Sequence, residues 1–394
     1  IQKITLESEN NFKFKINKNL KIRNLNINSD INLSNLVLIN NFDLKQIFPG
    51  IIKDTIFENH KIKINYNNGN YNINGSGKIL LQEKFDNIEY KISKNKDQIN
   101  YFTILKITKN LFKLDLLNYE KNKKTSLELE IKAKKKVNKG IIFEKISLKE
   151  QDNIIYVENL VLSKENKINK INKIKFDYKD NENFKNKIQI LYKDKIYLVK
   201  GNSFNINKII ENILNTDEKK QFKFLSNDLK FNFDINKIYL DQNNELKDLK
   251  GFLLFKNNKV FEANIESKFL NQKKIKFTIK TRDDKKITTL FSNEAKPIVD
   301  RYKFIKGFKK GSLDFYSVKT NNNSKSTLKI YDFKLKELPV LTSILTLASL
   351  QGIADLLSGE GIRFNEFEMN FTNKDNLMTI DEIYAIGPAI SVLV

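Results

Sequence analysis

The stretch Leu127-Glu128-Leu129-Glu130-Ile131-Lys132-Ala133-Lys134 decides the fold, because every second residue across it is apolar. Successive side chains of a β-strand point to opposite faces, so this segment has one apolar and one charged face. The same alternation returns in residues 12–16, 62–66, 174–178, 231–235, 261–265 and 275–279. Such a pattern is typical of an antiparallel sheet with one face in water. We therefore predict a mainly β protein.

The segments between these strands are rich in turn-forming residues. Asn67-Asn68-Gly69-Asn70, Asp180-Asn181-Glu182-Asn183 and Asn257-Asn258 are examples. The chain has only four prolines and 13 glycines, and it contains no Ser/Gly-rich or Pro-rich linker. We expect hairpins that follow one another in a long meander, forming a continuous sheet.

Composition narrows the class of protein. A chain of 394 residues with 40% hydrophobic content is large enough to bury a sizeable core. Its net charge of +23 would suit a polyanion or an anionic membrane, but the lysines are scattered through every segment. We therefore predict no nucleic-acid partner. The absence of cysteine excludes disulfides, thiolate metal sites and cysteine nucleophiles.

The C-terminal quarter has a more individual pattern. Alternation at Leu328, Ile330 and Phe333 predicts a strand that Pro339 ends. The uncharged residues that follow show helical spacing and predict a longer amphipathic helix over residues 340–357. Nearby glycines supply its end. This segment contains Pro, Gly, Gln and several hydroxyls, so we expect a buried or interfacial helix and not a membrane span.

The same region carries a family resemblance. It contains D-F-x-L-x-x-L-P, then A-S-L-x-G-I-x-D-L-L, G-x-G-I-x-F and finally G-P-A-I. In this order the elements resemble the C-terminal region of AsmA-like proteins. The positions that carry the motif are Asp332, Phe333, Leu335, Pro339, Leu350, Gly352, Leu356, Leu357, Gly359, Gly361, Phe364, Gly387 and Pro388.

The resemblance implies a place in the bacterial cell envelope. AsmA-like proteins are anchored in the inner membrane, extend through the periplasm and are implicated in moving phospholipid to the outer membrane. The match covers residues 294–394, so we divide the chain into a sheet segment, 1–293, and an AsmA-like C-terminal region, 294–394, incomplete at its C-terminus. We expect the chain to be part of a longer protein whose membrane anchor lies outside it.

The resemblance also implies a long, strongly curved sheet whose apolar concave face forms a groove. Phospholipid acyl chains would then occupy the space that side chains fill in a β-sandwich. From alternation we choose Phe14, Leu129, Ile131, Phe233, Ile265 and Phe277 as groove-lining residues. The hypothesis is a non-enzymatic, lipid-binding or lipid-conducting segment. The alternative is an envelope scaffold or assembly factor with a solid β-sandwich core and no lipid cargo.

Nothing in the sequence indicates catalysis, and we predict no metal and no cofactor. His60 is the only histidine and is interpreted as a lone surface residue. The pairs Asp283-Asp284 and Glu128/Glu130 are interpreted as solvated charges. Gly75-Ser76-Gly77-Lys78 lacks the full spacing of a phosphate loop and is interpreted as a turn.

Overall fold

The computed structural model describes residues 1–39, 44–136, 139–215, 228–257, 259–302, 307–336, 361–375, 377–388 and 391–393. Strands make up 73% of the structure and helices 4%. The large, open β-structure contains 22 strands, and β7 and β8 form a separate pair. The prediction of a mainly β protein is therefore confirmed. The chain divides into two compact units, Ile1–Asn227 and Asp228–Val394.

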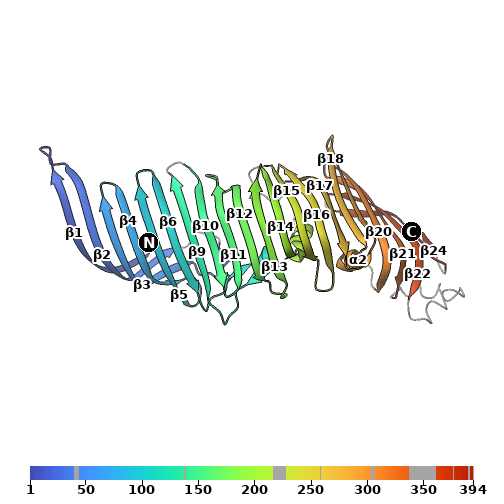
Figure 1. Cartoon of the computed structure of the whole chain (residues 1–394), viewed down its shortest axis with the longest axis horizontal. Helices are drawn as coiled ribbons and strands as arrows, with labels where there is room; N and C mark the ends of the chain where they lie inside the picture. The colour runs from blue at the N-terminus through green and yellow to red at the C-terminus, as the bar shows by residue number, and fades with distance from the viewer. Residues whose placement is uncertain are drawn as a thin grey trace. The chain divides into compact units, whose positions relative to one another are not determined.

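Unit 1 is an antiparallel meander (Figure 1). Each strand pairs with the next one in the chain, and β6 pairs with β9. Its strands are β1 (Lys3–Ile16), β2 (Ile22–Ile39), β3 (Asp54–Asn67), β4 (Asn70–Leu80), β5 (Phe85–Asn95), β6 (Gln98–Ile107), β9 (Leu127–Lys136), β10 (Ile141–Glu150), β11 (Asn153–Leu162), β12 (Ile168–Lys179), β13 (Lys185–Lys193) and β14 (Ile196–Asn205).

The short elements of unit 1 lie in two connections. The segment between β6 and β9 contains β7 (Lys113–Leu114), the 3₁₀ helix η1 (Asp115–Leu117) and β8 (Tyr119–Glu120). Helix α1 (Asn207–Asn215) follows β14.

Unit 2 repeats the meander, with each strand antiparallel to the next (Figure 1). Helix α2 (Lys296–Tyr302) lies in the connection between β19 and β20. The strands are β15 (Leu229–Tyr239), β16 (Glu245–Lys256), β17 (Lys259–Phe269), β18 (Lys274–Arg282), β19 (Lys285–Ser292), β20 (Phe308–Thr320), β21 (Asn323–Leu335), β22 (Ile362–Lys374), β23 (Leu377–Ile386) and β24 (Ser391–Leu393).

Several hairpin turns form where the turn residues predicted them. Between β3 and β4, Asn68 has φ 46° and Gly69 has φ 87°. Positive φ at both central positions gives the turn a twist that matches the twist of the flanking strands. Asp283 and Asp284, with φ of 46° and 61°, make the corresponding turn between β18 and β19. Both aspartates are exposed, as predicted.

Two predictions about the C-terminal quarter have different outcomes. The longer helix predicted over residues 340–357 lies outside the described residues and is not supported by the structure. The helices described are short, as expected for the rest of the chain. The predicted division after residue 293 falls between β19 and α2, inside unit 2, and stays a prediction.

Candidate functional site

The candidate site is the apolar face of the large sheet, taken separately in each unit. In unit 1, Ile131 on β9 pairs with Ile146 on β10, and the same register continues to Val157, Ile174 and Ile190 on β11, β12 and β13. Residues paired across an antiparallel sheet share a face. We call these five residues the central row. All five are half-buried, so the central row is accessible from one side of the sheet.

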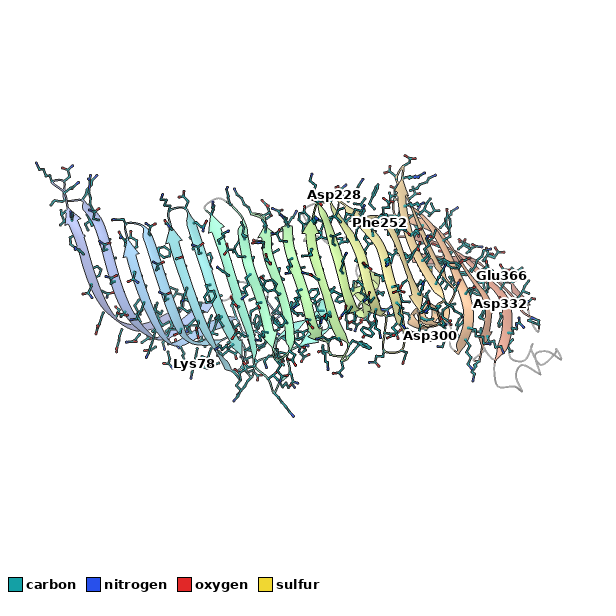
Figure 2. The ribbon with its side chains drawn as sticks, in the orientation of Figure 1. Lys78, Asp228, Phe252, Asp300, Asp332 and Glu366 are labelled. Carbon is teal, nitrogen blue, oxygen red and sulfur yellow. The ribbon has the colours of Figure 1, made fainter. Side chains whose placement is uncertain are left out.

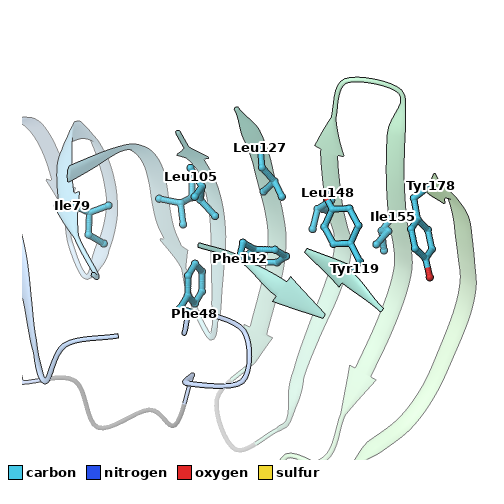
Figure 3. Close-up of a cluster of buried hydrophobic side chains, with 10 residues drawn as sticks. Phe48, Ile79, Leu105, Phe112, Tyr119, Leu127, Leu148, Ile155 and Tyr178 are labelled. Atoms are coloured by element: carbon cyan, nitrogen blue, oxygen red, sulfur yellow. The ribbon is translucent and has the colours of Figure 1, made fainter. Parts of the chain in front are cut away.

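One end of this face in unit 1 is covered. Phe48, from the β2–β3 connection, and Phe112 and Tyr119, from the β6–β9 connection, belong to one buried cluster with sheet residues such as Leu105 and Leu148 (Figure 3). The rings of Phe48 and Phe112 meet edge to face, with centroids 5.5 Å apart. The other buried members of this cluster are Ile79, Ile107, Leu127, Ile155 and Tyr178. The buried core of unit 1 therefore lies at one end of its strands, beside the central row.

Hydrogen bonds from buried charges hold the β6–β9 connection on the sheet. The Tyr119 hydroxyl donates to Glu150 Oε2 at 2.6 Å, and the backbone N–H of Asn122 donates to Glu150 Oε1 at 2.8 Å. Burial, together with this carboxylate, raises the pKa of Tyr119. Asp86 accepts hydrogen bonds from the Thr108 N–H at 2.8 Å and from Asn110 Nδ2 at 2.7 Å.

Lys121 lies between the two carboxylates, with 2% of its surface exposed. Its ammonium group donates to the carbonyl oxygens of Thr108 and Asn122, at 2.8 and 3.0 Å. Burial lowers the pKa of Lys121, while the charges of Glu150 and Asp86 oppose that shift. Burial likewise raises the pKa of Asp86, and its hydrogen bonds act against the rise. Such a network is costly to break, because each remaining buried charge would lose its partners. It makes the covered end a fixed part of the fold.

Unit 2 also has an apolar row across neighbouring strands and one covered end. Phe233 on β15 pairs with Gly251, and the register continues through Ile265 and Phe277 to Leu290 on β19. These apolar side chains are half-buried and share one face. Gly251 has φ 139°, and a Cβ there would collide with the carbonyl oxygen of Asn264. The glycine is therefore required by the close approach of β17.

Helix α2 covers one end of the apolar face of unit 2. Ala295 and Val299 are fully buried against β20, β21 and β22. There Phe308, Phe333 and Phe364 stack in a ladder, with ring centroids 5.2 Å apart in each neighbouring pair. Figure 2 labels Asp300 on α2 at this end of the strands.

The structure brings some of the predicted groove residues together. Phe233, Ile265 and Phe277 lie in the single row just described. Leu129 and Ile131 lie in neighbouring rows of unit 1, but Leu129 packs against the buried cluster and Ile131 belongs to the central row. Phe14 lies apart, at a register shift of β1, with 47% of its surface exposed. Their role as lining remains a prediction.

The motif residues are described only in part. Phe333 and Phe364 belong to the stacked ladder, and Leu335 is partly buried beside them. Asp332, with φ 51°, is exposed, and its carboxylate lies 3.9 Å from the Arg363 guanidinium; Figure 2 labels it. Gly361 has φ 93°, immediately precedes β22 and lies close to the backbone of Leu335. Gly387 and Pro388 follow β23. The motif positions outside the described residues are Pro339, Leu350, Gly352, Leu356, Leu357 and Gly359.

Two interpretations from the sequence were wrong. His60 is not a surface residue, because only 1% of it is exposed and its ring packs against Phe57 and Tyr90. His60 lies two residues before Ile62 on the apolar face of β3, and the register shift at Asn59, with φ 53°, brings Phe57 to the same face. Gly75-Ser76-Gly77-Lys78 is not a turn but the interior of β4. Its two glycines leave room for the rings of Tyr90 and His60.

The remaining sequence candidates lie where solvated charges were expected. Glu128 and Glu130 are on the polar face of β9, and Glu130 forms an ion pair with Lys145 at 2.5 Å. Within the described residues, no group of histidines and acids could hold a metal ion. In the same part of the chain, no helix combines the length and apolar character needed to cross a membrane.

Sequence reasoning missed most of the central row. Three of its members, Ile146, Val157 and Ile190, come from segments in which apolar and charged residues are mixed. Ile174 belongs to the alternating segment 174–178 but was not chosen as a lining residue. What unites them is cross-strand register, which depends on turn lengths and on bulges such as the one at Glu144. An alignment of successive hairpins by the lengths of their turns could have placed these residues opposite one another.

Comparison with known proteins adds no further information on identity. No protein-family profile matches this chain, and neither a curated protein nor a solved structure is significantly similar to it.

Proposed function

We propose that this chain is a lipid-binding and lipid-conducting segment of an AsmA-like envelope protein. Its apolar sheet faces would form grooves that hold phospholipid acyl chains, without chemistry on the cargo. The central row is the observation that carries the proposal, because it presents a band of half-buried branched side chains across five neighbouring strands.

The dimensions of the central row suit an acyl chain. Neighbouring strands are about 4.8 Å apart, so five strands span about 19 Å. Burying one methylene group is worth about 0.8 kcal/mol, and a tail of about 14 carbons would gain on the order of 10 kcal/mol before the cost of ordering it. A surface made of similar aliphatic side chains has no single preferred position for a tail. A bound lipid could therefore slide along it.

Each groove would be closed at its covered end. In unit 1 the β6–β9 connection with its buried charges closes it, and in unit 2 helix α2 over the phenylalanine ladder does so. The described residues contain only the short β7–β8 pair besides the large sheet, which favours the groove over the β-sandwich scaffold. We place the protein in the periplasm, anchored in the inner membrane by a part outside this chain. This placement rests on the resemblance of the motif residues to AsmA-like proteins.

The first test is lipid analysis of the chain purified without detergent. We expect mass spectrometry of organic extracts to find phospholipid in stoichiometric amounts, compared with an unrelated basic β-protein of similar size. Ile131→Glu and Phe233→Glu should reduce loading severalfold, because each places a charge in an apolar row. Lys132→Glu and Asn232→Glu change the adjacent residues on the opposite face and should leave loading unchanged. A folded protein with empty extracts, or loading unaffected by the first two substitutions, would contradict the groove.

A further inference from the structure

The two ends of the strands in unit 1 differ in charge. Opposite the covered end, the hairpins β1–β2, β3–β4, β5–β6, β9–β10, β11–β12 and β13–β14 form an edge that we call the open rim; the β3–β4 turn has no charged residue. In its described residues, the acids of these turns and of the strand ends beside them are Asp97, Glu144, Glu165 and Asp194, and Glu144 forms an ion pair with Lys134 at 2.7 Å. The basic residues of the open rim are Lys15, Lys18, Lys21, Arg23, Lys94, Lys96, Lys134, Lys135, Lys136, Lys139, Lys164, Lys167, Lys193 and Lys195.

The covered end of unit 1 has no such excess. There Asp86, Glu150 and Asp180 are buried together with Lys121, and acids and lysines are mixed in the surrounding connections. A general lysine bias in composition would enrich both ends alike. The contrast between them is therefore a property of the fold, because the meander places alternate hairpins at opposite ends.

Two lysines of the open rim belong to the apolar face itself. Lys94 on β5 pairs with Ile99 on β6, and Ile99 pairs with Lys135 on β9. Lys94 lies two residues beyond Ile92, and Lys135 two residues beyond Ala133, so each is the outermost residue of its strand on that face. Their strands are separated only by β6, about 10 Å in all. Two flexible ammonium groups at that spacing can converge on one phosphate.

Unit 2 shows the same arrangement independently. Lys286 on β19 pairs with Lys319 on β20, at the end of these strands opposite α2. Thr288 and Leu290 follow Lys286 on the same face, which leads to the row containing Phe277. Each unit thus has an apolar face that is covered at one end and carries a pair of lysines at the other.

We propose that Lys94 and Lys135 bind the headgroup of an anionic phospholipid whose acyl chains lie on the apolar face of unit 1. This inference rests on the proposed function and narrows its substrate class to lipids with net negative headgroups. A tail lying along the central row would end at Ile131 on β9, and Lys135 lies four residues farther along the same face of that strand. The phosphate would then lie at the open rim, where ammonium groups and water meet it. A zwitterionic headgroup gains less there, because its own ammonium group is repelled by the lysines.

The test is competition between two lipids with identical acyl chains. The chain, stripped of lipid, is incubated with vesicles of equal parts phosphatidylglycerol and phosphatidylethanolamine, separated from them, and its bound lipids are measured by mass spectrometry. We expect roughly fivefold enrichment of phosphatidylglycerol, because two partly exposed ion pairs each contribute modestly. Lys94→Gln with Lys135→Gln should abolish the enrichment while total bound lipid stays the same. High salt should also reduce it.

The matched control is Lys91→Gln with Lys106→Gln, which removes the same charge from the opposite face of β5 and β6. Equal loss of enrichment in this control would show a net-charge effect and overturn the inference. Bound lipid without headgroup preference would also overturn it while leaving the proposed function intact, whereas no bound lipid at all would reject the proposed function. Glycerophosphoglycerol alone, bound with the same dependence on Lys94 and Lys135, would assign the lysines to a free-anion site instead.

Discussion

The imidazole ring of His60 on β3 lies directly over Gly77 on β4, where a Cβ would overlap the ring. His60 Nε2 is 2.9 Å from the carbonyl oxygen of Lys78, so the ring is fixed between the two strands. The pair forms part of the apolar face of unit 1, with Tyr90 of β5 beside it. The one histidine of the chain is thus a packing residue matched to a glycine.

This match predicts strong coupling between the two positions. Gly77→Ala should lower the free energy of unfolding by about 2 kcal/mol, because the buried ring has to move. In a His60→Ala background the same substitution should cost less than about 1 kcal/mol. Urea unfolding of the two single variants and the double variant measures the coupling. Ser76→Ala, on the exposed face of β4, is the control and should have little effect. Additive effects of the two substitutions would contradict the packing account.

Leu129 and Ile131 should respond differently to a charge. Leu129 packs against the buried cluster, so Leu129→Glu should destabilise unit 1 by more than about 2 kcal/mol. Ile131 is half-buried in the central row, and Ile131→Glu should cost about 1 kcal/mol or less while lipid loading falls. Chemical unfolding, followed beside lipid phosphorus analysis, separates the two effects. Equal destabilisation by both would mean that the central row is covered like the core.

Alkaline pH should destabilise unit 1 through its buried tyrosines. Tyr178 is 1% exposed, and its hydroxyl donates to the carbonyl oxygen of Leu117 at 2.8 Å. Burial, and then the charge of Asp180, raise the pKa of Tyr178 above its ordinary value of 10.0. Above that pH the unfolded chain releases a proton that the folded chain keeps, so stability falls as pH rises.

The measurement is the free energy of unfolding from neutral pH to pH above 10.0, together with the ultraviolet absorbance of tyrosinate. Tyr178→Phe should lose about 1 kcal/mol at neutral pH with its hydrogen bond, but should show a shallower decline in alkali. An unchanged slope in this variant would show that Tyr178 does not contribute to the pH dependence.

The phenylalanine ladder should dominate the stability of unit 2. Phe333 stacks between Phe308 and Phe364, so Phe333→Ala removes both ring contacts and leaves a cavity under α2. We expect a loss of about 3 to 5 kcal/mol by urea unfolding. Tyr316→Ala changes an exposed ring of β20 and should cost less than about 1 kcal/mol. A small effect at Phe333 would place the stabilising core of unit 2 elsewhere.

The strands of this protein were determined by its local sequence. Alternation over residues 127–134 and in the other segments quoted above predicted strands that the structure contains, because period-two patterning suits only an extended chain at a water boundary. The Asn-Gly turn at residues 68 and 69 predicted its hairpin for an equally local reason, the positive φ that both residues accept. The antiparallel meander followed from short turns between successive strands.

Tertiary structure alone decided which parts of each sheet face are covered and which are exposed. Leu129 and Ile131 are two residues apart in one alternating pattern, yet only Leu129 packs against the buried core, because the β6–β9 connection folds back over one end of the sheet. His60 continues the alternation of Ile62 and Ile64, but it is buried because the rings of Phe57 and Tyr90 pack against it, and no local pattern encodes the bulge at Asn59 that brings Phe57 to this face. Lys94 and Lys135 come together at the open rim only through the register of β5, β6 and β9. The sequence by itself determined strands and turns, whose energetics are local, while cover, register and the gathering of charge depend on contacts between residues far apart in the chain.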